Sequence, residues 1–452
     1  MSFSDRFARL FRNVLPAPFT IAVLLTFLTF ILALVFTGES NAQGAAVFFN
    51  ILEYWEMGLW DGPLMIFAMQ MMLMLVLGHV LALTKPVNNL IQYAVRYCNN
   101  TANAAAIVTV LTLLVSFFNW GLGLVFGAIF ARKVAENALR NDFRINYPVI
   151  GAAGYSGLMV WHGGLSGSAP IKVAEPGHFL VDKIGVISQS ETIFSAMNIS
   201  VSCALIMVLP AVMFFVGKRS LPEPLSLKTS VLIEDDITVP ETGAGKLDQS
   251  RIIAWVFGLL FMVFAFYSAF IKPPKLTLEF ITPNFINLVL LGIGILLHKN
   301  FKQFVSAVDG AISGASGILI QFPLYFGIMG IMKYSGLVTV FSDFFVSISN
   351  EATFPLFTFM SAAIVNVFVP SGGGQWAIQG PILAEAALQL QLPISKSIMA
   401  LAYGDQITNM MQPFWALPLL GITGLKAKEI LPYTLILMIA GAVIFISGLL
   451  IF

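Results

Sequence analysis

The sequence predicts an all-α polytopic membrane protein that contains two inverted repeats, each with a re-entrant hairpin and a broken helix. Three observations predict this class. Of the 452 residues, 58% are hydrophobic and only 10% are charged, against roughly 25% charged in an ordinary soluble domain. Apolar runs long enough to cross a bilayer recur along the chain,. Short stretches of Gly, Ser and Asn interrupt several of these runs in both halves.

The composition excludes several other classes of protein. A chain of this length cannot build a soluble surface from so few charges,. Cys98 and Cys203 are too few for a disulfide scaffold,. A formal net charge of +1 argues against nucleic acid as a partner,. The lipid bilayer is therefore the expected environment.

Residues 1–14 read as an amphipathic helix on the membrane surface, because Arg6, Arg9 and Arg12 lie away from an apolar stripe,. An apolar run at 16–37 follows as the first span. A cleaved signal peptide is the alternative, but the run is too long and no small-x-small cleavage site follows. The basic start places the N-terminus in the cytoplasm, and the loop 38–60, without Lys or Arg, lies outside,.

The apolar stretch 104–131 is the first predicted hairpin. Span 63–83 precedes it and returns to the cytoplasm at Lys85. Both ends of 104–131 are basic, and its middle contains the polar, Gly-bearing break Phe118–Gly123. A stretch that begins and ends at basic flanks favours a re-entrant hairpin. A single kinked span is the alternative.

A repeat relates the two halves of the chain. Three features recur 247 or 248 residues later, in the same order along the apolar runs,. They are Asp61-Gly62 with Asp309-Gly310, Asn119 with Asn366, and Pro170 with Pro418. The second half also contains an interrupted run at 353–391, which predicts a second hairpin.

Counting spans then gives the topology. The remaining predicted spans are 149–170, broken near Gly163–Pro170, then 191–217, 251–271, 279–298, 307–332, 397–419, broken near Gln412-Pro413, and 431–452. The first repeat covers 15–217, a cytoplasmic linker covers 218–250, and the second repeat covers 251–452. The total is about nine full spans and two hairpins, with a periplasmic C-terminus. Opposed repeats with broken helices are typical of secondary transporters.

The interruptions indicate a shared polar site near the middle of the membrane. A break in a helix survives in lipid only where protein or water covers it. The residues at the breaks are hydroxyls, amides and glycines, and no Arg or Lys lies at a hairpin tip. Backbone N–H groups at helix starts and side-chain donors suit a small monocarboxylate. The alternative is that these residues only satisfy kinks and help the helices pack.

Ionisable residues inside spans are candidates for coupling to an ion. Asp405 lies deep in the second broken span, and His79 lies within 63–83. We expect Asp405, with His79 as the next candidate, to carry a proton or to bind sodium. His162 and Glu385 are further ionisable residues in or near the spans. For all of these, a hydrogen-bonded structural role is the alternative. No metal cluster and no cofactor is predicted.

Enzyme motifs are incomplete. Gly164-Leu165-Ser166-Gly167 matches a signal of intramembrane serine proteases, but no His is placed to activate Ser166,. Ala402-Tyr403-Gly404-Asp405 lacks the first Gly of the aspartyl protease motif. We therefore expect no enzyme, and an intramembrane hydrolase remains as a weak alternative.

Five motifs resemble the short-chain fatty acid transporter family, and they extend across nearly the whole chain. They are Asn119-Trp120-Gly121, Gly163–Ser168, Gln321-Phe322-Pro323, Val369–Pro381 and Gln412–Pro418. The resemblance implies uptake of acetoacetate- or butyrate-like acids across the bacterial inner membrane. It also implies kinship with the ion-transporter superfamily, whose members often move as elevators. One departure from the pattern is His162, where Gly is expected after Trp161.

Together these arguments predict a cation-coupled symporter of short-chain monocarboxylates. A carrier of a dicarboxylate or amino acid and a channel-like facilitator are the alternatives. The oligomeric state is open, with a homodimer as one option. The candidate substrate-binding residues are Asn119, Trp120, Gly121, Ser166, Gly167, Ser168, Asn366, Ser371, Gly372, Gly373, Gly374, Gln375, Thr408, Asn409 and Gln412.

Overall fold

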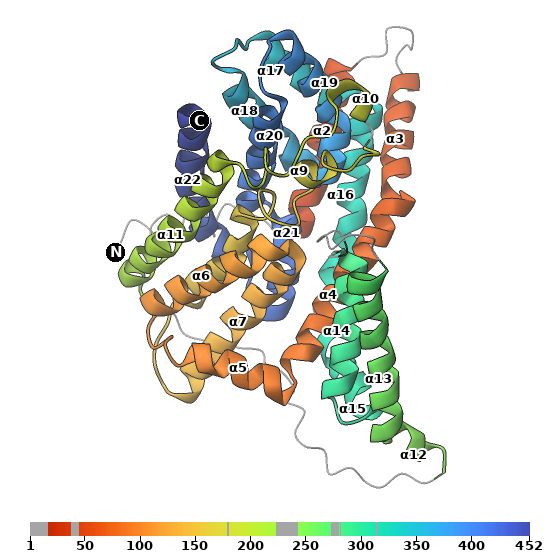
Figure 1. Cartoon of the computed structure of the whole chain (residues 1–452), viewed down its shortest axis with the longest axis vertical. Helices are drawn as coiled ribbons and strands as arrows, with labels where there is room; N and C mark the ends of the chain where they lie inside the picture. The colour runs from red at the N-terminus through yellow and green to blue at the C-terminus, as the bar shows by residue number, and fades with distance from the viewer. Residues whose placement is uncertain are drawn as a thin grey trace.

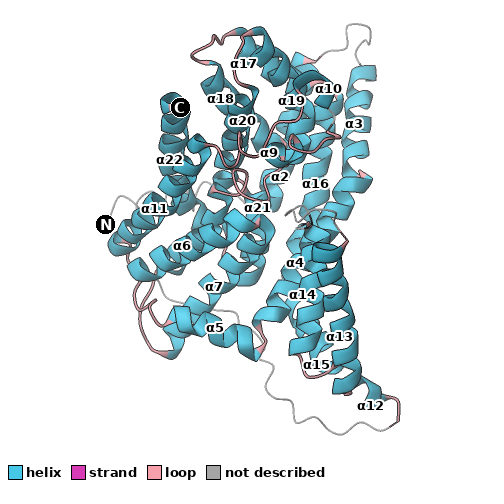
Figure 2. Ribbon diagram, viewed as in Figure 1, coloured by secondary structure: helices cyan, strands magenta, loops and turns pink. Residues whose placement is uncertain are grey.

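The computed structural model describes residues 17–37, 45–178, 180–222, 243–272, 280, 282–312 and 315–452. Every regular element in these ranges is helical (Figure 2). Seven of the described helices are long and apolar enough to cross a membrane. The predicted all-α membrane class is therefore confirmed. The expected surface helix 1–14 and most of the linker 218–250 lie outside the described residues.

The helices of the first half run from the first span to the linker. They are α2 (Pro18–Phe36), α3 (Ala45–Leu59), α4 (Gly62–Ala82), α5 (Lys85–Val95), α6 (Thr101–Phe118), α7 (Trp120–Arg140), α8 (Tyr147–Tyr155), the 3₁₀ turn η1 (Ser156–Met159), α9 (Ala169–Lys172), α10 (Val181–Ile184) and α11 (Ala196–Arg219).

The helices of the second half begin after the linker. They are α12 (Gly245–Asp248), α13 (Arg251–Phe266), the π-helical η2 (Tyr267–Ile271), α14 (Pro283–Leu297), α15 (Phe301–Ile312), α16 (Ser316–Tyr334), α17 (Leu337–Ser347), α18 (Phe354–Phe368), α19 (Gly372–Gln389), α20 (Ile394–Thr408), the 3₁₀ turn η4 (Asn409–Met411), α21 (Pro413–Thr423) and α22 (Ala427–Ile451).

One side of the molecule is a column that contains α3, α4 and α13–α16 (Figure 1). In it, α3 packs against α16 at a contact between glycines. A Cβ atom added to Gly58 would lie 2.8 Å from the Cα atom of Gly330, and the same holds in reverse. Because neither residue has a side chain, the two helix backbones touch. The column is therefore tightly joined where α3 crosses α16.

The helix α3 corrects the sequence interpretation, which expected a loop over 38–60. Residues 45–59 are helical because Ile51, Trp55, Gly58 and Leu59 follow one another at helical spacing on the face toward α16,. The glutamates of this segment, Glu53 and Glu56, lie on the same helix. The predicted span 307–332 likewise differs, because helix α15 ends at Ile312 and α16 begins at Ser316.

The other side of the molecule contains the interrupted helices. Here α6 packs on α7 and α11, and α18 packs on α20 (Figure 1). The breaks at Asn119 and at 369–371 separate α6 from α7 and α18 from α19. The third break, 160–168, is longer than predicted, because regular helix ends at Met159. The fourth lies at η4 and Gln412, near its predicted place.

The three sequence matches between the halves do not mark equivalent positions. Asp61 caps the start of α4, whereas Asp309 lies inside α15. Asn119 caps α7, whereas Asn366 lies in the last turn of α18 and the cap of α19 is Ser371. A new helix begins directly after each of these two breaks. The residue that caps the new helix is Asn119 at the first break and Ser371 at the second, so the matched residues Asn119 and Asn366 have different roles.

Candidate functional site

An asparagine, Asn119, caps the helix that begins after the first break. Asn119 has an extended backbone, with φ of −150° and ψ of 123°. The N–H group of Leu122 donates to Asn119 Oδ1 over 3.0 Å. This cap satisfies one of the free N–H groups at the start of α7. Asn119 is 3% exposed, so its amide lies inside the protein.

The segment 160–168 lies against this first break. The N–H group of Trp120 donates to Ser166 Oγ over 3.0 Å. The N–H group of Leu165 donates to the carbonyl oxygen of Phe117 over 2.8 Å. A Cβ atom on Gly164 would lie 2.4 Å from that carbonyl oxygen, so the close approach requires glycine,. The first and third breaks therefore form one joined region.

The second break lies on the same region. Ser371 caps α19 by accepting a bond from the N–H group of Gly374 over 3.2 Å. Gly372 packs on the third break: a Cβ atom there would lie 2.8 Å from His162 Cε1 and 3.2 Å from Ser168 Oγ. Gly373 is exposed and has only Ser168 within 4.0 Å of such an atom. The glycine run thus brings the start of α19 onto His162 and Ser168.

An amide network joins the second break to the fourth. The Nδ2 group of Asn366 lies within bonding distance of the Asp405 carbonyl, of Thr408 Oγ1 over 3.0 Å and of Asn409 Oδ1 over 2.8 Å. Gln412 Nε2 donates to the carbonyl oxygen of Asn366. The end of α18 is thereby fixed to the end of α20. These amides are hydrogen-bonded to one another, and whether they also bind substrate stays a prediction.

Hydrogen bonds between the two halves of the chain join the third break to the fourth. His162 Nδ1 lies 2.6 Å from Asp405 Oδ2, and the His162 N–H group donates to Gln406 Oε1 over 3.0 Å. The hydroxyl of Tyr155 donates to the carbonyl oxygens of Asn409 over 2.8 Å and Gln412 over 3.1 Å. All four breaks are therefore in contact, although they are far apart in sequence.

Several buried polar atoms at this junction have no hydrogen-bond partner among the described residues. They are Ser116 Oγ, Asn366 Oδ1, Gln375 Oε1, Asp405 Oδ1, Asn409 Nδ2 and Gln412 Oε1. Buried polar atoms are usually bonded, so an unpaired group calls for an explanation. Their concentration at the breaks is what a site for a polar ligand or ion would produce.

A pocket of about 230 Å³ opens beside the second break. It lies between the column and the start of α19, and its lining residues are Gly58, Asp61, Pro63, Leu64, Phe326, Met329, Gly330, Lys333, Tyr334, Val369 and Gly374. The exposed Lys333 on α16 belongs to this lining. The sequence interpretation that no Lys or Arg lies near a hairpin tip is therefore incomplete, because folding brings Lys333 there from another helix.

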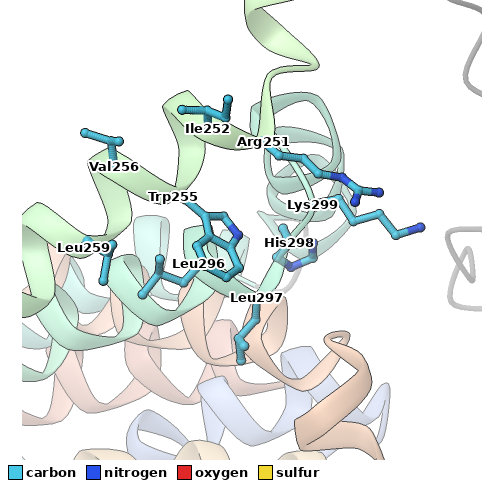
Figure 3. Close-up of a pocket in the computed structure, with 9 residues that line it drawn as sticks. All are labelled: Arg251, Ile252, Trp255, Val256, Leu259, Leu296, Leu297, His298 and Lys299. Carbon is cyan, nitrogen blue, oxygen red and sulfur yellow. The ribbon is translucent and has the colours of Figure 1, made fainter.

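A larger pocket, of about 570 Å³, lies elsewhere (Figure 3). It is formed by α13 and the end of α14, and Arg251 and Lys299 stand at one edge of an apolar wall that includes Trp255. None of its lining residues belongs to a break. Its wall consists mainly of the exposed face of α13, with the end of α14, and we do not assign substrate to it.

Aromatic rings surround the junction. Trp120 lies 5.9 Å from Trp161 and 5.2 Å from Trp415, measured between ring centroids. Phe414 stacks on Phe322 at 4.1 Å. Trp120 and Phe414 therefore lie at the junction, whereas Phe118 is 43% exposed. Gly121 lies nearby, packed on Met74.

Other candidates have different places. His79 on α4 interacts with Arg132, Lys133 and Glu136 of α7, and not with Asp405. Gln375 Nε2 donates to the carbonyl oxygen of Ala362, so its amide holds α19 on α18. Gly167 packs against the backbone of His162, where a Cβ atom would lie 2.1 Å from its carbonyl oxygen.

Sequence reasoning missed Tyr155, Asn198 and Gln406, which fasten the breaks through hydrogen bonds. Asn198 Nδ2 donates to the Gly163 carbonyl over 2.8 Å and Asn198 Oδ1 accepts from the Tyr403 hydroxyl over 3.0 Å. None of these residues stands at a break, so no local pattern marks them. His162 had one signal, its departure from the expected Gly.

The fold and the junction define a multi-pass membrane protein with a polar site where its helices are interrupted. The chain belongs to the short-chain fatty acid transporter family, whose model matches residues 2–452. It is a transporter and not an enzyme. This excludes the intramembrane hydrolase that the sequence left as an alternative.

Two relatives carry the name "putative short-chain fatty acid transporter". One, from Escherichia coli (strain K12), is 37% identical over 446 residues, which cover 97% of this chain and 96% of the relative. The other, from Haemophilus influenzae (strain ATCC 51907 / DSM 11121 / KW20 / Rd), is 35% identical over 449 residues, which cover 96% of each. The predicted family is thereby confirmed.

Two solved structures are distantly similar. The YdaH transporter of Alcanivorax borkumensis has a TM-score of 0.44 and 12% identity, with 96% of this chain and 98% of that chain covered. MtrF of Neisseria gonorrhoeae, described as illuminating a class of antimetabolite efflux pumps, has a TM-score of 0.37 and 14% identity, with 97% and 96% covered. Similarity at this level supports no conclusion about the site.

Proposed function

We propose that the chain is a secondary active transporter that carries short-chain monocarboxylates, such as butyrate and acetoacetate, across the bacterial inner membrane together with a cation. The observation that carries this proposal is the junction of four helix breaks, which brings the backbone start of α19 and serine hydroxyls together within an aromatic surround. Such groups recognise a single carboxylate and leave room for a short apolar tail.

The proposal places the substrate between the start of α19 and the column, in the pocket of about 230 Å³ that includes Gly374 and Lys333. A small cavity favours a short acid over a long one. The lining of this pocket includes Val369 and Gly374 of the second break, whereas the candidate residues Ser166, Ser168, Ser371 and Gly373 lie outside the lining, partly or fully exposed at the breaks. Their hydroxyl and N–H groups are therefore the ones we assign to the carboxylate.

The proposal includes inverted repeats. The order of elements from α14 to α22 parallels the order from α2 to α11, apart from the short α10. For example, α5 and α17 each have 11 residues, and α11 and α22 have 24 and 25. In this scheme α6–α7 and α18–α19 are re-entrant hairpins, the N-terminus is cytoplasmic and the C-terminus is periplasmic.

The helices divide into the column and, on the other side of the molecule, a bundle that contains the interrupted helices. This division supports an elevator movement of the bundle along the column. The column would then be the natural place for a homodimer contact. A gradient of protons or sodium would drive accumulation, with Asp405 as the coupling residue. These are proposals that rest on the arrangement of helices and on the buried carboxylate,.

Uptake of labelled butyrate and acetoacetate into proteoliposomes tests the function. We expect counterflow with no imposed gradient and accumulation when a cation gradient is imposed. Protein-free liposomes correct for undissociated acid that crosses lipid unaided. Exchange without gradient-driven accumulation would indicate a facilitator. Faster uptake of a dicarboxylate or an amino acid would overturn the assignment of substrate.

A further inference from the structure

The contact between His162 and Asp405 is the basis of a further inference. His162 lies in the third break and Asp405 near the end of α20, and the two residues are 0% and 1% exposed. His162 Nδ1 lies 2.6 Å from Asp405 Oδ2. His162 is the only side chain within ion-pair distance of Asp405 among the described residues. The two groups therefore act as a pair.

The hydrogen bonds define the proton positions of the pair. The N–H group of Ala169 donates to His162 Nε2 over 3.1 Å, so Nε2 carries no proton. A neutral imidazole then carries its proton on Nδ1, which donates to Asp405 Oδ2. Asp405 Oδ1 is buried and has no partner among the described residues. A buried carboxylate with one donor is costly in its charged form.

The pair can accept one further proton in two ways. The proton can bond to Asp405 Oδ1, which leaves every existing hydrogen bond in place. Alternatively it can bond to His162 Nε2, which turns an acceptor into a donor and breaks the bond from Ala169,. Both forms remove the net charge of the pair. The second form also releases the start of α9, one residue after Ser168.

Within the part of the chain that the structure describes, no other side chain forms an ion pair with either member of the pair. The elements packed around the pair carry several charged or titratable side chains. In the first half of the chain these are Arg132, Lys133, Glu136 and Arg140 on α7, Tyr147 and Tyr155 on α8, Lys172 on α9, and Cys203, Lys218 and Arg219 on α11. In the second half they are Glu385 on α19, Lys396 and Tyr403 on α20, and Lys428, Glu429 and Tyr433 on α22. Helices α6, α18 and α21 carry none. Glu136 pairs with Arg132 and Lys133, and Glu385 pairs with Lys183.

The pair lies directly beneath the start of α19. The ring of His162 stacks on Trp161, with centroids 4.5 Å apart. A Cβ atom on Gly372 would lie 2.8 Å from His162 Cε1 and 2.9 Å from Trp161. An anion held at the N–H groups of the glycine run would be close to the pair. It would be repelled by an ionised pair and accepted beside a neutral one.

We propose that His162 and Asp405 form the proton-carrying pair of this transporter. The pair takes up one proton as one monocarboxylate binds at the start of α19, and it gives up that proton when the acid leaves on the other side. Each cycle then moves one anion and one proton, and no net charge. This inference rests on the proposed function and makes the proton, not sodium, the coupling ion.

The test is equilibrium binding of butyrate to the purified full-length chain in detergent, which avoids passive flux of the acid. Tryptophan fluorescence reports binding, because Trp161 stacks on His162. We expect the apparent Kd to rise with pH, by up to about tenfold per pH unit, as linkage to one proton requires. A pH-indicator dye in weak buffer should register about one proton taken up per butyrate bound. Replacing sodium by choline should change neither result.

Three variants localise the proton. Asp405→Asn should remove the dependence of Kd on pH. His162→Gln can still donate to Asp405 and accept from Ala169, but it cannot titrate, so the pH at which the dependence appears should shift. His298→Gln is the matched control, since His298 is buried and bonded to the Val80 carbonyl oxygen, away from the breaks. It should behave as the wild type.

Several results would contradict the proposal that His162 and Asp405 carry the coupled proton. They are a wild-type Kd that depends on sodium and not on pH, no proton uptake on binding, an unchanged pH dependence in Asp405→Asn, and an unchanged midpoint in His162→Gln. The wild-type measurements decide the matter even if a variant fails to fold. Absence of butyrate binding at every pH would instead overturn the proposed function itself.

Discussion

Two residues cap the helices that begin at the breaks. A structural role and a ligand-binding role can be tested for each of them. Asn119 caps α7 and Ser371 caps α19. Asn119→Ala and Ser371→Ala should each raise the half-saturating concentration of butyrate at least about tenfold, because a hydrogen bond to a charged group contributes about 1.5–3 kcal/mol. The measurement is initial uptake into proteoliposomes over a range of butyrate concentrations.

The loss of a helix cap is separable from the loss of a ligand contact. Asn100 caps α6 by accepting from the N–H group of Asn103 over 2.9 Å, at the exposed end of that helix. Asn100→Ala should therefore lower the free energy of unfolding by about 0.5–2 kcal/mol, as the loss of any such helix cap should, and leave uptake unchanged. If all three variants show equal kinetics, Asn119 and Ser371 serve packing alone.

Lys333 is a second residue whose role the structure makes testable. It is exposed at the pocket beside Gly374, and its ammonium group lies 4.9 Å from the centre of the Tyr334 ring. An exposed cation attracts an anion weakly, by about 0.2–1 kcal/mol. Lys333→Gln should thus raise the half-saturating concentration by up to about fivefold, and added salt should reduce the difference. Lys396→Gln, at the start of α20, serves as the control. Unchanged uptake in Lys333→Gln at low salt would remove Lys333 from the substrate path.

At the scale of the element, the start of α19 offers a matched pair of glycines. A methyl group on Gly372 would meet His162 and Trp161 at under 3.0 Å, whereas one on Gly373 would meet only Ser168, at 4.0 Å. Gly372→Ala should force α19 away from the third break and reduce the initial uptake rate at least about tenfold. Gly373→Ala keeps the backbone N–H group that we assign to the carboxylate and adds a methyl group in open space, so it should leave the rate within about twofold,. Equal rates in the two variants would contradict the close packing of α19 on His162.

The sequence predicts the broken elements well and their partners poorly. Small polar residues inside apolar runs mark the breaks at Asn119, at 369–371 and near Gln412, because a lipid-exposed helix has no other use for them. The contact between His162 and Asp405 leaves no local signal, since 243 residues separate them. The same holds for Lys333, which reaches the second break from another helix.

The helix α3 shows a different reason for failure. The segment 38–60 was interpreted as a loop because it contains glutamates and no Lys or Arg, a pattern that bears on membrane topology and not on local structure. The period of Ile51, Trp55 and Leu59 would have predicted a helix with one buried face,. The matches at an offset near 248 misled in a related way: Asn119 and Asn366 share a residue type, whereas the shared structural role belongs to Asn119 and Ser371.

At the scale of the whole molecule, the junction should select for charge. It offers neutral donors, aromatic rings and one exposed cation, Lys333. Lys333 can compensate the charge of one carboxylate only weakly, because it is exposed,. The burial of a second carboxylate therefore costs more free energy than this one cation returns. At a pH where both carboxyls of succinate are ionised, unlabelled butyrate should inhibit labelled uptake at least about tenfold better than succinate. Valine, at the same concentration, controls for size with a zwitterion. Stronger inhibition by succinate than by butyrate would contradict the assignment.

The glycine contact between α3 and α16 has a mechanical consequence. Helices separated by side chains can slide as rotamers adjust, but Gly58 and Gly330 leave no such compressible layer between the two backbones,. The two helices therefore form one stiff strut. The stiff part is the crossing itself, because Pro323 removes a backbone hydrogen bond within α16,. Beyond the crossing, α3 ends at the turn before Asp61, and α16 is followed by Gly336, whose φ of 76° is left-handed,.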